Sequence, residues 1–140
     1  MALIWKKHLS VGNAMLDSEH KNLIGIVNSM EYAIKTRNSF ALLGTIIQFK
    51  DCLHIHFANE SRLVQAFDFP FDQHDMSHQH LLKELQHTKN DLEAKVGLWP
   101  EYVMDHYPQF LMDWLVGHII QEDMLMEPLL ESYPYDFKPA

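Results

Sequence analysis

In four long stretches of the chain, hydrophobic residues recur at intervals of three and four positions. That spacing places them on one face of an α-helix, and it predicts four helices that each bury one side. No stretch shows the strict alternation of a half-buried strand. The predicted helices cover residues from about 18 to 37, from 39 to 67, from about 72 to 96 and from about 108 to 130.

Short polar residues and prolines mark the ends of these helices. Asp17 or Ser18 can cap the first helix, and Asn38-Ser39 can cap the second. Residues 68–72, with Pro70 among them, separate the second helix from the third. Pro108 is tolerated only in the first turn of a helix, so we expect a short helical piece over 101–106 and the start of the fourth helix at Pro108.

Four amphipathic helices with short connections predict an all-α fold, an antiparallel up-down-up-down four-helix bundle. With 140 residues, 47% of them hydrophobic, the chain can form one core without disulfides. We therefore expect a single domain over 1–140. It would comprise an extended arm over 1–17, the bundle over about 18–131 and a C-terminal tail over 132–140.

Charge, hydropathy and cysteine content narrow the expected partners and location of the protein. The net charge is −8 and no Lys/Arg cluster is present, so we expect no nucleic-acid partner. No window reaches the roughly 18 apolar residues of a membrane span, and the N-terminus does not resemble a secretory signal. Cys52 is the single cysteine, which excludes an intramolecular disulfide. The cytoplasm is the expected location.

Histidines and carboxylates occur at spacings that suit a metal site. Residues four apart on a helix lie within about 40° of each other, so each such pair can present two ligands from one face. Two of these pairs lie close together in the sequence, on the second and third predicted helices. Three further donors lie near the start of the first helix and in the later half of the fourth. The seven candidates are His20, His56, Glu60, His74, His78, His118 and Asp123.

In the predicted antiparallel bundle, the start of the first helix, the end of the second, the start of the third and the end of the fourth share one end. All seven donors then fall at a comparable depth, which predicts a metal centre inside the bundle. Imidazole and carboxylate without thiolate suit zinc, copper, iron or manganese. Seven donors exceed the four of a structural zinc site, so a two-metal centre with both carboxylates bridging is the natural count. The other five histidines are expected to be solvated: His8, His54, His80, His87 and His106.

The ordered set of residues resembles the hemerythrin family, and within it the single-domain bacteriohemerythrins. The likeness covers nearly the whole chain. It rests on Trp5, Val11-Gly12, Asp17 to His20, His56-Phe57 to Glu60, Pro70 before His74-x-x-x-His78, Trp114 to His118, and Asp123.

The resemblance implies two iron ions. His74, His78 and His118 would bind one iron, and His20 and His56 the other. Glu60 and Asp123 would bridge the pair together with an oxo or hydroxo group. In this family the two-histidine iron keeps a vacant position, where dioxygen binds reversibly. Four apolar residues resemble those that line the oxygen pocket: Phe57, Trp114, Leu115 and Ile119.

The leading interpretation is therefore a non-enzymatic protein for oxygen carriage, storage or sensing, with an oxygen-consuming enzyme as a recipient. One alternative is a diiron enzyme acting on peroxide or nitric oxide, for which Tyr32, Tyr102 and Tyr107 are the tyrosines to consider. Another is iron handling, in which the irons are cargo. Reversibility of oxygen binding, turnover of peroxide or nitric oxide, and exchange of bound iron with a chelator distinguish the three.

Overall fold

The computed structural model describes residues 4–67, 72–95, 113–114, 117 and 122–139, apart from the side chains of residues 39, 72–74, 88 and 91–95. Within these ranges the chain forms helices and contains no strand. The elements are η1 Lys7–Leu9, α1 Ala14–Lys35, α2 Ser39–Phe67, α3 Asp72–Lys95, η3 Asp123–Met126 and α5 Glu127–Leu130.

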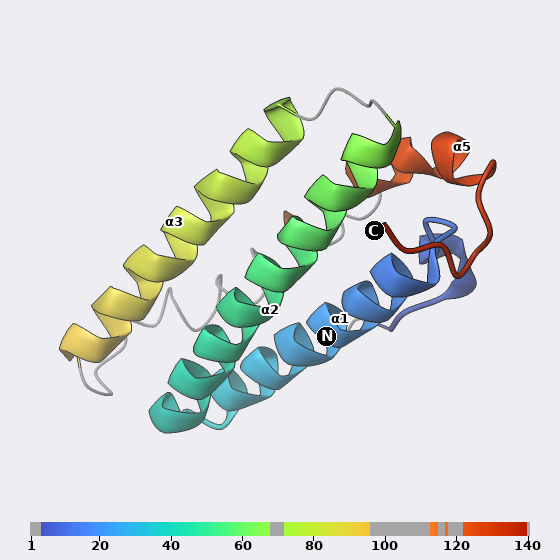
Figure 1. Ribbon diagram of the computed structural model, residues 1–140. Helices are drawn as coiled ribbons and strands as arrows, with labels where there is room; N and C mark the ends of the chain where they lie inside the picture. Colours follow the sequence, from blue (N-terminus) through green and yellow to red (C-terminus); the bar gives the residue numbers. More distant parts are fainter. Residues whose placement is uncertain (1–3, 68–71, 96–112, 115–116, 118–121, 140) are drawn as a thin grey trace.

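The helices α1 and α2 form an antiparallel pair, and α3 runs back beside α2 (Figure 1). The described residues of the fourth predicted segment, at 113–114, 117 and 122–130, are also helical. The start of α1, the end of α2 and α5 lie at one end of the molecule. The prediction of an all-α bundle with an N-terminal arm is confirmed. No helix in the described ranges is long and apolar enough to cross a membrane.

The helix α1 begins one turn earlier than the sequence predicted. The cap is Asn13, whose side-chain oxygen accepts the backbone N–H of Leu16 at 3.1 Å, and the first helical residue is Ala14. The prediction of a cap at Asp17 or Ser18 is wrong, because both residues already lie within the first turns of α1. The second helix starts as predicted.

Asp17 instead ties the arm and the C-terminal tail to α1. Its buried carboxylate accepts the Val11 backbone N–H at 2.9 Å, the Tyr135 hydroxyl at 2.8 Å and the hydroxyl of Ser10. The backbone N–H of Ala14 also donates to the carbonyl of Tyr135, at 2.8 Å. The first turn of α1 is therefore fixed from both ends of the chain.

The fourth predicted helix does not continue without interruption to Leu130. The 3-10 helix η3 ends at Met126, and the short helix α5 begins at Glu127 with Pro128 in its first turn. Proline has no N–H to donate to the carbonyl of Met124, so the regular α-helical ladder cannot pass this point. The N–H of Glu127 donates to that carbonyl instead, in the tighter spacing of a 3-10 turn.

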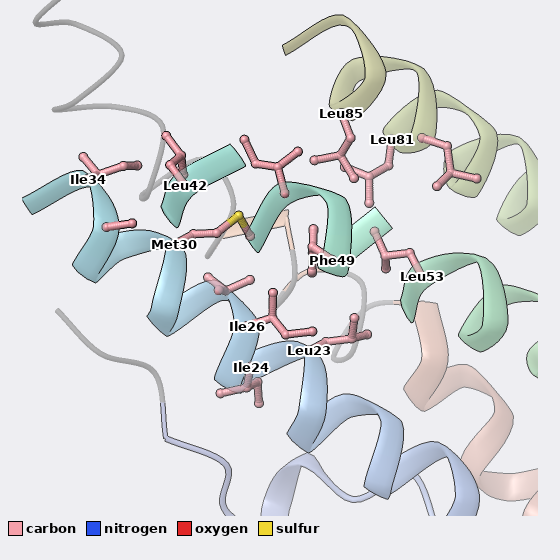
Figure 2. Packing of buried hydrophobic residues seen from close by; sticks show 14 of the residues in the cluster. Leu23, Ile24, Ile26, Met30, Ile34, Leu42, Phe49, Leu53, Leu81 and Leu85 are labelled. Atoms are coloured by element: carbon pink, nitrogen blue, oxygen red, sulfur yellow. The ribbon is translucent and has the colours of Figure 1, made fainter. Parts of the chain in front are cut away.

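Two hydrophobic clusters form the core. The larger, here called the inner cluster, joins α1, α2 and α3 through residues such as Leu23, Phe49 and Leu81 (Figure 2). The smaller, here called the end cluster, lies where the two termini meet the helices and comprises Val11, Leu16, Leu63, Val64, Met126 and Leu130. Along α1 and α2, the polar residues described next lie between these clusters.

Candidate metal centre

Four side chains from three parts of the chain meet between the two clusters. Each of His20, His56, Glu60 and Asp123 offers one potential ligand atom, and these atoms all lie within 4.8 Å of one another. All four residues are 0% exposed. Two carboxylates buried together carry a high desolvation cost unless positive charge compensates them. The burial and the donor types therefore both fit a metal ion at this position.

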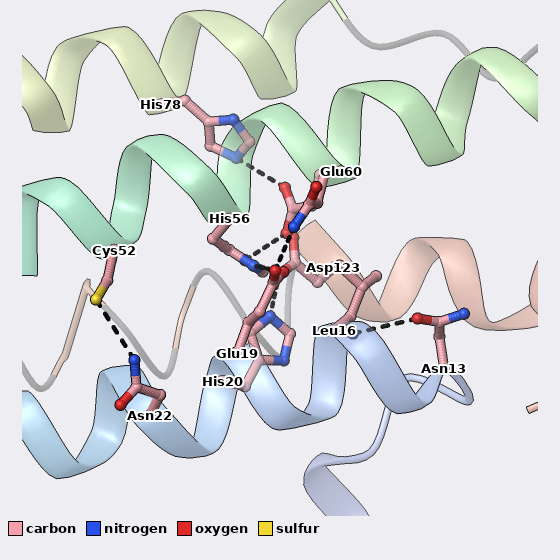
Figure 3. A network of polar contacts seen from close by, with 11 residues as sticks. Asn13, Leu16, Glu19, His20, Asn22, Cys52, His56, Glu60, His78 and Asp123 are labelled. Carbon is pink, nitrogen blue, oxygen red and sulfur yellow. Dashed lines mark hydrogen bonds and ion pairs between the residues drawn. The ribbon is translucent and has the colours of Figure 1, made fainter. Parts of the chain in front are cut away.

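Each element places its donor for a simple reason. On α2, His56 and Glu60 are four residues apart and so present their side chains from one face. On α1, His20 lies one turn after Leu16 of the end cluster and just before Leu23 of the inner cluster. Asp123 begins η3 and points at the same space (Figure 3).

The distances between these donors suit ligands of one ion. The Nε2 atom of His20 lies 2.7 Å from Oδ2 of Asp123, and Nε2 of His56 lies 2.7 Å from Oε1 of Glu60. Nε2 of His56 is also 3.6 Å from Oδ2 of Asp123. Adjacent ligands held about 2.1 Å from one ion are about 3 Å apart. The three nitrogen–oxygen separations lie on either side of this value, so the donors are close enough together to share one ion.

His78 extends the group onto α3. It is 0% exposed, and its Nε2 atom lies 3.1 Å from Oε2 of Glu60. The two oxygens of Glu60 thus face histidines on different helices, His56 on α2 and His78 on α3. A carboxylate in that position can serve two ions at once.

The remaining sequence candidates cannot be placed in the same way. His74 belongs to α3, but its side chain is not among those that the structure describes. His118, Leu115 and Ile119 lie outside the described residues altogether. For these four, as for the other candidates, ligation and pocket lining stay predictions.

Glu19 is a site residue that the sequence analysis missed. Its Oε1 atom accepts Nδ1–H of His56 at 2.8 Å, and its Oε2 atom accepts the amide N–H of Asn59. His56 is thereby held at both ring nitrogens (Figure 3). The signal was weak, because Glu19 lies on a different helix from both partners and no spacing within one helix reveals the contact.

These surroundings make His56 unusually basic. Burial by itself lowers the pKa of His56, but the charge of Glu60 and the hydrogen bonds that the imidazole donates to the carboxylates of Asp123, Glu19 and Glu60 outweigh that effect. The net result is a pKa raised well above the ordinary value of 6.5. The carboxylates that favour a proton on His56 would also favour a metal cation at this position.

Aromatic rings border the donors on one side. The ring of Phe57, which is 7% exposed, stacks on the imidazole of His78 with centroids 3.6 Å apart and planes 4° apart. Trp114 meets Phe57 edge-on at 6.4 Å and packs against the inner cluster. Both residues were candidates for an apolar pocket, and the structure places Phe57 against the donor His78 and Trp114 against Phe57.

The histidines that the sequence analysis set aside behave as expected wherever they are described. The exposed ones are His8, His54, His80 and His87. The prediction that these four are solvated is confirmed, and His106 lies outside the described residues. Among the described residues, the group around His56 is the single cluster of metal-competent side chains.

Fold and site together define a class: an all-helical bundle with a buried group of imidazole and carboxylate side chains that fits a metal ion. Residues 11–130 match the family model described as the hemerythrin HHE cation binding domain. The match covers most of the chain, so the protein belongs to this family. The resemblance seen in the sequence is confirmed.

Curated relatives are similar to this chain over most of their length. A bacteriohemerythrin of Stenotrophomonas maltophilia is 25% identical over 136 residues, which are 96% of this chain and 86% of the relative. A bacteriohemerythrin of Pseudomonas aeruginosa is 25% identical over 122 residues, 86% of this chain and 76% of the relative. A hemerythrin-like protein of Naegleria gruberi is 25% identical over 127 residues, 90% and 92% of the two chains.

Proposed function

We propose that this protein binds dioxygen reversibly at a non-haem diiron centre, for carriage, storage or sensing, and that it is not an enzyme. His20 and His56 would hold one iron. His74, His78 and His118 would hold the other. Glu60 and Asp123 would bridge the two irons together with an oxo or hydroxo group.

The position of Glu60 is the observation that carries this proposal. Its two oxygens face His56 at 2.7 Å and His78 at 3.1 Å, and these histidines belong to the two different irons of the proposed set. Asp123 supports the same division, because its Oδ2 atom faces His20 and His56, both assigned to one iron. When bound, a pair of ferrous ions can supply the two electrons that dioxygen accepts.

The surroundings favour binding over turnover. Reversible binding requires that water and proton donors be kept from the bound gas. Phe57 stacks on the donor His78, and Trp114 packs against Phe57. Along α1 and α2, the donors lie between the inner and end clusters. We propose that Phe57, Trp114, Leu115 and Ile119 line the oxygen pocket.

Tyr32 gives no support to the enzymatic alternative. It is 70% exposed, and it lies twelve residues beyond His20 on α1, which is about 18 Å along the helix axis. A redox-active tyrosine would have to be much closer to the irons. In the proposed role the protein acts in the cytoplasm with dioxygen as its ligand, and carriage would require an oxygen-consuming enzyme as recipient.

Optical titration of the iron-loaded protein tests this function. Protein loaded with Fe²⁺ under argon should bind two irons per chain, and visible charge-transfer absorption should appear when oxygen is admitted. The absorption should disappear under vacuum and return with oxygen over several cycles.

Three results would count against the proposal. One iron per chain at saturation would remove the diiron centre. Absorption that decays without recovery would contradict reversible binding. Sustained consumption of peroxide or nitric oxide by the reduced protein would favour the enzyme.

A further inference from the structure

We infer that Glu19 is a positioning residue for the iron held by His20 and His56, and that it acts by fixing the imidazole of His56. The inference rests on the proposed diiron centre. It concerns this chain's own side chains, and it can be tested with a metal that does not react with dioxygen.

Glu19 is placed to control the orientation of His56. Its Oε1 atom is 2.8 Å from Nδ1 of His56, while Nε2 on the other side of the ring faces Glu60 at 2.7 Å. A hydrogen bond to the carboxylate keeps the proton on Nδ1 and leaves the lone pair of Nε2 directed at the metal position. The negative charge of Glu19 also makes the imidazole a stronger donor.

Asn59 keeps Glu19 in this position. Its amide N–H donates to Oε2 of Glu19, so both carboxylate oxygens are engaged. Asn59 lies three residues after His56 on α2, and both side chains therefore face α1. With both oxygens held, the carboxylate of Glu19 cannot swing into solvent without breaking two hydrogen bonds.

The contact joins the two helices that carry the two-histidine iron. Glu19 and His20 are neighbours on α1, and His56 is on α2. The side chain of His56 is 1% exposed and that of Glu19 is 19% exposed, so Glu19 forms the border between the buried donors and water. Loss of Glu19 should therefore weaken this metal position and leave the His78 position unchanged.

Titration with Co²⁺ against a competing chelator provides the test. Glu19→Ala removes both hydrogen bonds. Glu19→Gln keeps an oxygen that can accept from Nδ1 of His56 but removes the charge. The matched control is Glu31→Ala, which removes a carboxylate that pairs with Lys35 from the same helix, about 18 Å further along and away from the donors.

We expect the natural protein to bind two Co²⁺ ions per chain. In Glu19→Ala one of the two binding steps should weaken by about 10- to 100-fold, the usual effect of removing such a partner. Glu19→Gln should fall between that variant and the natural protein, and Glu31→Ala should bind both ions normally. The imidazole Nδ1–H of His56, observed by NMR in the Co²⁺ protein, should exchange with water faster in Glu19→Ala.

Two results would overturn the inference. Unchanged Co²⁺ affinity in Glu19→Ala would show that Glu19 does not position His56. Equal weakening of both binding steps, together with a lower melting temperature, would indicate a general loss of structure. Failure of reversible oxygen binding in the natural protein would contradict the proposed function and leave the Co²⁺ result standing.

Discussion

The contact between Phe57 and His78 shows how a single apolar residue can shape the site. The two rings are parallel within 4° and 3.6 Å apart, so the imidazole of His78 can turn only by losing this contact. Its Nε2 atom stays directed at Glu60 as a result. Phe57 therefore has a second role beside lining a pocket, because it holds a proposed ligand in place.

Substitution of Phe57 by Leu should separate this role from simple packing. Leucine keeps an apolar side chain but removes the flat ring, so we expect the metal position of His78 to weaken by several-fold in Co²⁺ titration. The free energy of unfolding should fall by about 1 kcal/mol. Phe49→Leu is the control, since Phe49 is buried in the same helix and the same cluster. Equal Co²⁺ affinity in the two variants would contradict a positioning role for Phe57.

Contacts within one helix were easier to predict from the sequence than contacts between helices. His56 and Glu60 were found from their spacing, and His20 and Asp123 from the depth of their positions in a bundle. Glu19 could not be found, because its hydrogen bond to His56 depends on the rotation of α1 against α2. That rotation is set by the packing of the whole inner cluster and by no local pattern.

At the scale of elements, helix ends show the same difference between local signals and contacts with distant residues. The start of α2 was predicted because Asn38 caps it locally, by accepting the N–H of Ala41 at 3.0 Å. The start of α1 was misjudged because Asn13 caps the helix and also donates its amide to the carbonyl of Phe137, at 2.9 Å. A contact between residues 124 positions apart leaves no periodic signal. The break at Pro128 has a local signal, the proline itself, which the prediction of one continuous helix did not take into account.

These two caps offer a direct comparison of local and distant stabilisation. Asn38→Ala removes an exposed cap and should lower the free energy of unfolding by about 1 kcal/mol. Asn13→Ala removes a buried cap and also the hydrogen bond to Phe137, so we expect a loss of about 2 kcal/mol. Urea denaturation of the metal-free protein measures both values. A loss in Asn13→Ala no greater than in Asn38→Ala would show that the tail adds nothing to the stability of α1.

At the scale of the whole molecule, the chain interrupts its core with a layer of ionisable groups. Buried histidines and carboxylates occupy the space between the inner and end clusters, where apolar side chains would stabilise the fold more. Without a metal, the attraction between a protonated His56 and its carboxylate neighbours has to offset that cost. The stability of the metal-free protein should therefore depend on the charge of His56.

The sign of this dependence follows from the raised pKa. Because folded His56 binds its proton more tightly than unfolded His56, its contribution to stability is fully present below about pH 6.5 and is lost as the pH rises through the folded value. The melting temperature of the metal-free protein should accordingly fall as the pH is raised above about 6.5. A bound cation replaces the proton, so the iron-loaded protein should show a smaller fall.

The variant His56→Gln isolates the contribution of this one residue. Without the imidazole, the metal-free protein should have a flatter dependence of melting temperature on pH over the same range. Calorimetry of the two metal-free proteins from pH 6 upward provides the comparison. An identical slope in both would mean that another group releases the proton. In that case the exchange of a proton for a metal ion would not take place at His56, and the compensation of the buried carboxylates would have to come from elsewhere in the bundle.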